Sequence, residues 1–278
     1  VAYFMFPIQY SNESVTPQET INEYWKFCMP LIPFTWVGMI MGYADTRLLQ
    51  EYGGATEQAY YAVAAQFAAV SLIATSSVLR ILWKEVSEAN ERGDKERVRY
   101  LYERSTRVLF VVGAFISGFI IPWSEEVINL VLGPDYLNGA WAMALMFLYP
   151  VHQSLGQITG TMFYALEMTR SYVLIGSVNM VISIVAVYFL LAPSESSIPG
   201  LGLASIGLAL KMIVFQIIGV NFMMWWLSKK IQSDYSVGFQ LGGIALFTSV
   251  GFVAHHLIER MVGGEAHVAI RAGFAVLV

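Results

Sequence analysis

Long apolar runs alternate with short polar segments along almost the whole chain. A helix needs about 20 mostly apolar residues to cross a hydrocarbon core about 30 Å thick, and this length test selects a series of predicted spans. They cover residues 24–48, 58–82, 108–123, 137–165, 172–192, 201–227 and 239–258. Apolar residues at 1–8 and from about 266 onwards indicate two further, partial spans.

This pattern predicts an all-α fold, a polytopic integral membrane helix bundle. A bilayer admits only helices or closed barrels, and the apolar runs are too long and continuous for barrel strands. The composition agrees, because 56% of the residues are hydrophobic and 13% are charged, whereas about a quarter are charged in a soluble domain. Since the chain begins and ends inside apolar runs, we expect it to be a piece of a longer protein.

Positive charge gathers in the polar segment 83–107, which we expect to be a loop containing a solvated amphipathic helix, with a lipid head-group contact as the alternative. Interspersed acids distinguish it from a nucleic-acid-binding surface. Strict alternation of the spans places this loop on the same side as Lys26, Arg170 and Lys229, and that side holds 12 of the 16 Lys and Arg residues. The positive-inside rule therefore predicts that 83–107 is cytoplasmic.

Motifs of soluble enzymes are absent from the sequence. It has no GxxxxGK[ST] for nucleotide phosphates, no HExxH for zinc and no GxSxG nucleophile elbow. Cys28 is the single cysteine, which excludes an intrachain disulfide and a cysteine metal cluster. We therefore expect no enzymatic activity, no cofactor and no metal site.

Polar side chains at membrane depth are the candidates for function, because they are costly to insert. Lys211 lies close to the middle of the span 201–227 and has no partner at the i±3 or i±4 positions of its own helix. It should face a polar cavity or an acceptor on another helix; a structural pair with a residue such as Asn179, or snorkelling to the interface, is the alternative. Asp45, near the end of the first span, is a candidate for the translocation path.

The other polar residues that could line a substrate cavity each have a purely structural explanation as the alternative. Arg47 can pair with Glu51 at i,i+4, and polar residues near the middle of 137–165 can serve interhelical hydrogen bonding. The candidate lining of a substrate cavity comprises Asp45, Arg47, Gln66, Arg80, His152, Gln157, Asn179 and Lys211.

Glycine and proline predict how the helices pack and bend. GMIMG at 38–42 and GQITG at 156–160 space two small residues four apart, which allows a close helix approach. Pro30 and Pro33 interrupt the backbone hydrogen bonds of the first span, so we expect a kink there.

The order of these features resembles a known family. The first span starts with CMPLIPF and ends with YADTRLL. It is followed in order by AYYAVAAQFA, a basic amphipathic segment, VLGPDYLNGAWAMALMF, MFYALEMTRSY and PGLGLASIGLAL. This order is similar to the second half of bacterial polysaccharide flippases of the O-antigen and capsule type. These belong to the multidrug/oligosaccharidyl-lipid/polysaccharide exporter superfamily, and the likeness extends over essentially the whole chain.

The resemblance implies a division of the chain and a function. Residues 1–8 would end a preceding span, 24–228 would form a six-helix C-terminal transporter lobe, and 237–278 would add further spans, the last one truncated. The function implied is a flippase that moves an undecaprenyl-pyrophosphate-linked oligosaccharide across the bacterial inner membrane by alternating access. Asp45, Arg47 and Gln66 would lie nearest the substrate. Implied partners are the lipid-linked oligosaccharide and membrane lipids, with a glycan polymerase and chain-length machinery as further candidates, and no nucleic acid.

Two other functions remain open at this stage. A cation-coupled multidrug exporter of the same superfamily would need carboxylates inside the membrane to exchange protons, and Asp45 is the clear one in the sequence. A membrane scaffold or enzyme of glycan assembly would need an extramembrane domain or clustered catalytic carboxylates, and the sequence predicts neither.

Overall fold

The computed structural model describes residues 17–70 and 73–262, and every regular element in these ranges is a helix. The predicted all-α fold is therefore confirmed. In chain order the elements are α1 (Pro17–Cys28), α2 (Leu31–Val70), α3 (Ile73–Glu91), α4 (Lys95–Ile120), η1 (Ile121–Trp123), α5 (Ser124–Val131), η2 (Pro134–Gly139), α6 (Ala140–Met146), α7 (Tyr149–Ala165), α8 (Thr169–Leu191), α9 (Ala204–Ile231) and α10 (Val237–Val262).

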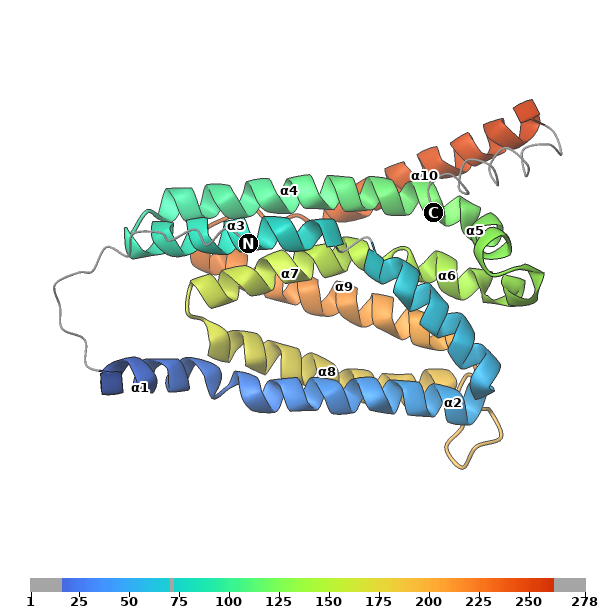
Figure 1. The fold of residues 1–278 in the computed structure, drawn as a ribbon, viewed down its shortest axis with the longest axis horizontal. Coiled ribbons are helices and arrows are strands. Elements are labelled where there is room, and N and C mark those ends of the chain that lie inside the picture. Colours follow the sequence, from blue (N-terminus) through green and yellow to red (C-terminus); the bar gives the residue numbers. More distant parts are fainter. Residues whose placement is uncertain (1–16, 71–72, 263–278) are drawn as a thin grey trace, which may run out of the picture.

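The helices run mostly along one long axis in three layers (Figure 1). One outer layer holds α8 and the part of α2 before Gly54, the middle holds α7 and α9, and the other outer layer holds α3, α4 and α10. α7 is the most buried element, with Val151, Leu155 and Ile158 fully inside. Large apolar side chains such as Trp36, Leu174 and Phe252 are instead exposed on the outward faces. Lipid is the solvent that such faces require.

Five stretches of the described chain are long and apolar enough to cross a membrane: Pro17–Ala69, Lys95–Val131, Thr169–Leu191, Ala204–Ile231 and Val237–Arg260. The predicted spans 172–192, 201–227 and 239–258 each correspond to one of these. The first stretch joins the predicted span 24–48 to the first part of 58–82, the rest of which falls in α3 after residues 71–72, which lie outside the described chain. The predicted partial spans at 1–8 and from 266 also lie outside it.

Two backbone breaks shape the first stretch. The helix is interrupted at Met29 and Pro30, between α1 and α2, which confirms the predicted break. Pro33 falls in the first turn of α2, where a missing N–H costs no helical hydrogen bond. At Gly54 the backbone leaves helical geometry, with φ 81° and ψ 179°, and α2 changes direction there (Figure 1). Glycine adopts this positive φ without the steric cost that a side chain would bring.

Residues 83–107, expected as a loop containing an amphipathic helix, are helical on both sides of a short turn. They form the end of α3, a short turn and the start of α4. Asp94 caps α4 by accepting a hydrogen bond from the Arg97 backbone N–H at 2.9 Å. Val86 and Val98 are buried on the inner face of this hairpin. The charged residues thus form the outer face of two packed helices, which is why the segment folds despite its polarity.

The predicted span 137–165 is divided by a turn at Phe147 and Leu148 into α6 and α7. Pro150 lies in the first turn of α7, the position that proline tolerates in a helix. The segment between the predicted spans 108–123 and 137–165, which should be a loop, contains the short helices α5 and η2. The span is therefore two helices of seven and 17 residues rather than one.

The two small-residue motifs behave differently. A side-chain carbon at Gly156 would lie 2.8 Å from Val220 of α9, and one at Gly160 would lie 3.2 Å from Tyr172 of α8. Close packing at GQITG is therefore confirmed. At GMIMG, Gly38 would only touch Met180 at 3.6 Å, and Gly42 has nothing within 4 Å in the described structure. The prediction of a close helix approach at GMIMG is thus wrong for the described structure.

Candidate functional site

A buried ion pair joins α2 to α9. Lys211 Nζ donates a hydrogen bond to Asp45 Oδ2 at 2.5 Å, and the two residues are 5% and 8% exposed. Asp45 Oδ1 is buried and accepts no hydrogen bond within the described chain. Taking two charges out of water is expensive, and their attraction repays the cost only with good geometry and satisfied remaining groups.

A buried apolar cluster lies within one helical turn of both members of this pair. Leu49 follows Asp45 by one helical turn and packs with Leu208, Val187 and Leu191 in one buried cluster of α2, α8 and α9. Tyr61, from the part of α2 after the Gly54 break, packs against the same cluster. The ion pair therefore lies in a low-dielectric part of the bundle, where charge interactions are strong.

A cavity of about 260 Å³ lies between α2, α7, α8 and α9; apolar side chains and several amides line it, and it is called the polar cavity below for those amides. Gln153, Gln157, Asn179 and Gln216 contribute amide groups to its lining. Gln216 donates a hydrogen bond to Gln153 at 2.5 Å, and Gln157 Oε1 is buried without a partner in the described structure. Gln153 and Gln157 share one face of α7 at i,i+4, so the helix period lines up their amides.

The structure brings four of the predicted site residues together in two pairs. Asp45 meets Lys211, and Gln157 shares the polar cavity with Asn179. Asn179 donates to the Phe215 carbonyl at 3.4 Å, so it is not the partner of the lysine that the sequence suggested as an alternative.

The other four predicted residues lie apart from these pairs. Arg47, Gln66 and Arg80 are exposed, and no ion pair joins Arg47 to Glu51 in the part of the chain that the structure describes. His152 is 3% exposed and lies against Gln240 of α10. The geometry therefore centres the candidate site on α2, α7, α8 and α9.

Some residues of the site escaped the sequence analysis. Gln216 was missed as a cavity residue, although it follows Lys211 on α9 by about one and a half turns. Glu57 was also missed: its Oε2 accepts hydrogen bonds from the Ser205 backbone N–H at 3.1 Å and from Ser205 Oγ at 2.5 Å, at the start of α9. Tyr149, which donates to Gln153 at 3.2 Å, could have been found from its i,i+4 spacing.

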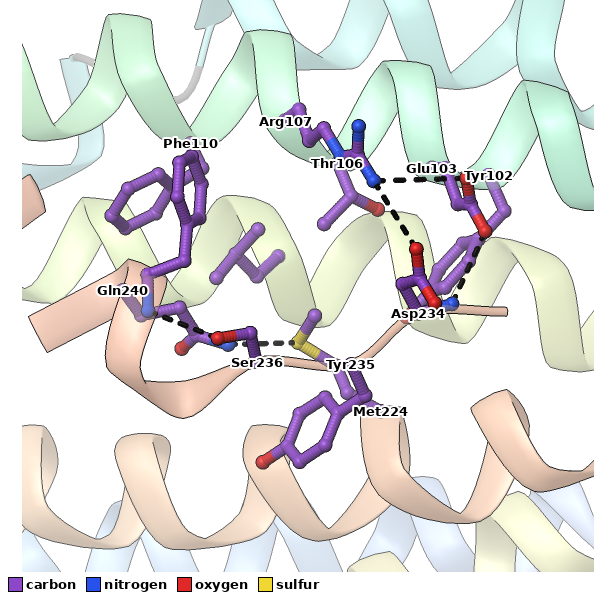
Figure 2. Close-up of a pocket in the computed structure, with 12 residues that line it drawn as sticks. Tyr102, Glu103, Thr106, Arg107, Phe110, Met224, Asp234, Tyr235, Ser236 and Gln240 are labelled. Carbon is purple, nitrogen blue, oxygen red and sulfur yellow. Dashed lines mark hydrogen bonds and ion pairs between the residues drawn. The ribbon is translucent and has the colours of Figure 1, made fainter. Parts of the chain in front are cut away.

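A second, larger pocket of about 500 Å³ lies where the α9–α10 connection meets α4 (Figure 2). Arg107 bridges Glu103 and Asp234, at 3.8 Å to each carboxylate, and the Asp234 backbone N–H donates to Glu103 at 3.1 Å. Figure 2 shows these groups at one end of the pocket and Gln240 at the other. Glu103 also lies 4.0 Å from Arg99, so two acids and two bases meet at this end of the pocket.

Fold and site together define a polytopic α-helical membrane protein with a buried charge pair and a polar cavity among its helices. A family model described as "Polysaccharide biosynthesis protein" matches residues 1–148, more than half of the chain. The chain therefore belongs to this family, which confirms the family resemblance recognised in the sequence. The matched region contains Asp45 but not Lys211. No curated protein and no solved structure matches the chain.

Proposed function

We propose that the protein exports a lipid-linked glycan, an undecaprenyl-pyrophosphate-linked oligosaccharide, across the bacterial inner membrane by alternating access. The observation that carries the proposal is the buried Asp45–Lys211 pair in a member of a polysaccharide biosynthesis family. Hydrophobic residues of similar volume often stabilise a protein as well as a buried ion pair does. The ion pair is therefore better explained by a function in which Lys211 exchanges Asp45 for another anion than by a contribution to the stability of the fold.

The proposed exchange of anions at Lys211 follows from the charges of the ion pair and of the substrate. Lys211 is the cation, and a pyrophosphate entering between α2 and α9 competes with Asp45 for it. Charge-assisted hydrogen bonds to phosphate are comparable in strength to those with a carboxylate. Binding of the head group would release Asp45 and loosen the contact of α2 with α9. A substrate that binds the loosened state better shifts the population towards it.

The amides of the polar cavity suit the sugar portion of the substrate. Gln153, Gln157, Gln216 and Asn179 offer both donors and acceptors, as sugar hydroxyls require. The unpartnered Gln157 Oε1 is one acceptor left for a ligand in the described structure. Arg47 and Gln66 are exposed on α2, where a cavity shared with the preceding lobe expected from the resemblance would reach them.

The proposed orientation rests on charge. The α3–α4 turn, the α7–α8 turn and the α9–α10 connection lie towards the same end of the bundle (Figure 1). Residues 83–107, Arg170, Lys229 and Lys230 flank these connections and account for ten of the 16 Lys and Arg residues. The positive-inside rule supports a cytoplasmic location for that end, including residues 83–107.

Replacing the lysine tests the proposal. In cells that depend on the intact protein for surface glycan, Lys211→Leu should reduce surface glycan more than it reduces the amount of folded protein in the membrane. Lys211→Arg, which keeps the charge, is the matched control and should retain most of the export. Surface glycan is measured by immunoblotting and folded protein by detergent size exclusion.

Two results would contradict the proposal. Wild-type export by Lys211→Leu at normal protein level would mean that the lysine is only tolerated. Resistance to cationic drugs conferred by the intact protein, with surface glycan unchanged on its deletion, would favour the cation-coupled multidrug exporter.

A further inference from the structure

Three potential metal ligands meet at the end of the bundle away from the α3–α4 turn. Glu126 lies in the first turn of α5, and His255 and Glu259 lie one turn apart on α10. His255 Nε2 lies 3.0 Å from Glu126 Oε1, and His255 Nδ1 lies 3.7 Å from Glu259 Oε2. One ligand atom from each residue falls within 4.8 Å of the others. The cluster shares no residue with the Asp45–Lys211 site.

Packing holds two of the three ligands in place. The His255 ring packs edge-on against Trp123, with centroids 4.4 Å apart. One turn earlier on α10, a side-chain carbon at Gly251 would lie only 2.3 Å from the Gly118 carbonyl oxygen, so α10 and α4 are in backbone contact. The side chains of Glu126 and His255 are each 17% exposed, whereas that of Glu259 is 56% exposed. The site is thus rigid on its inner side and open to a ligand on its outer side.

The charges of the cluster do not balance. Two carboxylates face a single imidazole, and within the described chain neither glutamate forms an ion pair with a lysine or arginine. Glu126 Oε2 is buried and has no hydrogen-bond partner among the described residues. A buried carboxylate oxygen without a partner carries a desolvation cost that a cation would remove.

We propose that Glu126, His255 and Glu259 bind a divalent transition-metal ion of the zinc type and thereby fasten α10 to α5. Imidazole and carboxylate are ligands that zinc accepts, and three protein ligands plus one water complete its four-coordinate geometry. His255 and Glu259 supply two ligands from one helix face, and Glu126 supplies the third from a separate element. The metal therefore bridges α10 to the helices that precede α6. The proposal does not depend on the exported substrate.

No metal site was expected from the sequence, because it lacks the HExxH and cysteine-pair motifs, in which the ligands are close in sequence. Here 129 positions separate Glu126 from His255, so only the fold brings them together.

Zinc titration of the intact protein, purified in detergent and stripped with a chelator, tests the site. Isothermal titration should show one equivalent of Zn²⁺, and the thermal unfolding midpoint should rise with Zn²⁺ concentration. His255→Ala and Glu126→Gln should weaken Zn²⁺ binding about 100-fold or more, since even changes next to metal ligands cost about 10–100-fold. The matched controls His256→Ala and Glu125→Gln alter exposed neighbours of the ligands and should bind Zn²⁺ as the wild type does.

Cobalt substitution of the wild-type protein gives a readout that does not depend on whether a variant folds. Co²⁺ in the site should produce the visible d–d bands of a four-coordinate ion, and Zn²⁺ should displace it. Absence of saturable Zn²⁺ binding to the wild type would overturn the proposal and leave the cluster as a contact between α5 and α10 without a metal. Zn²⁺ binding that survives in His255→Ala, or that is lost in His256→Ala, would overturn it as well.

Discussion

The α2–α9 contact and the α4–α10 contact join neighbouring helices in opposite ways. The α2–α9 contact contains a buried ion pair, Asp45–Lys211, with a lone oxygen left unpartnered in the described structure. The α4–α10 contact has no ion pair inside the described bundle core; Gly118 and Gly251 bring the two backbones together, and Phe110 packs on Phe239 with centroids 5.1 Å apart.

Under the proposed alternating access, the difference indicates which of the two contacts would open. Close-packed surfaces tolerate little displacement, because van der Waals packing holds helices together in a membrane and a small shift opens voids in it. An ion pair can exchange one partner for another ion of the same sign. We therefore infer that α4 and α10 move as one body, while α2 and α9 separate when an anion takes the place of Asp45.

Removing one charge of the pair should have the largest effect on stability. Lys211→Leu leaves Asp45 buried without its cation, and breaking a buried pair in this way costs about 3–5 kcal/mol. The double variant Asp45→Leu/Lys211→Leu should recover most of that loss, because no charge remains buried. Thermal unfolding of the purified variants in detergent provides the comparison.

Asp45→Leu alone is the second single variant, and it completes a double-mutant cycle with Lys211→Leu and the double variant. It leaves the lysine, instead of the carboxylate, buried without its partner. Additive losses in the double variant would mean that the two charges do not interact, contrary to their 2.5 Å separation.

Adding a methyl group to the α4–α10 contact should have a smaller effect. In Gly251→Ala the new carbon would overlap the Gly118 backbone, and overpacking of this kind costs about 1–3 kcal/mol. Gly242→Ala on the same helix is the matched control, because a carbon there meets nothing within 4 Å in the described structure. It should leave stability unchanged or raise it by up to about 1 kcal/mol, since alanine favours a helix over glycine.

The measurement for this pair is again the thermal unfolding midpoint. Equal midpoints for Gly251→Ala and Gly242→Ala would show that the two helices are not in backbone contact.

Much of the fold was predictable from the sequence because it depends on local patterns. The lengths of α8, α9 and α10 follow from their apolar runs, and the break before α2 follows from Pro30. The helical character of 83–107 was foreseen only in part, since its buried Val86 and Val98 are hidden among charges. Local patterns therefore predict elements better than they predict the packing between them.

The candidate site depended on contacts between distant residues, which one sequence does not reveal. Lys211 was expected to find an acceptor on another helix, but nothing local identifies a partner 166 positions away. Asp45 was singled out for the translocation path and not as that partner. Gln66 is exposed on α2, so its predicted place in the cavity lining stays a prediction.

Translocation by the charge-free double variant tests the central claim most directly. Intact wild-type protein and Asp45→Leu/Lys211→Leu are reconstituted in liposomes with an undecaprenyl-pyrophosphate oligosaccharide, and transfer between leaflets is followed by access of an impermeant lectin. The folded double variant should translocate about tenfold more slowly or worse, because a charge-assisted contact of about 1.5–3 kcal/mol with the head group is lost. Translocation at the wild-type rate would contradict the claim and reduce the ion pair to a structural contact.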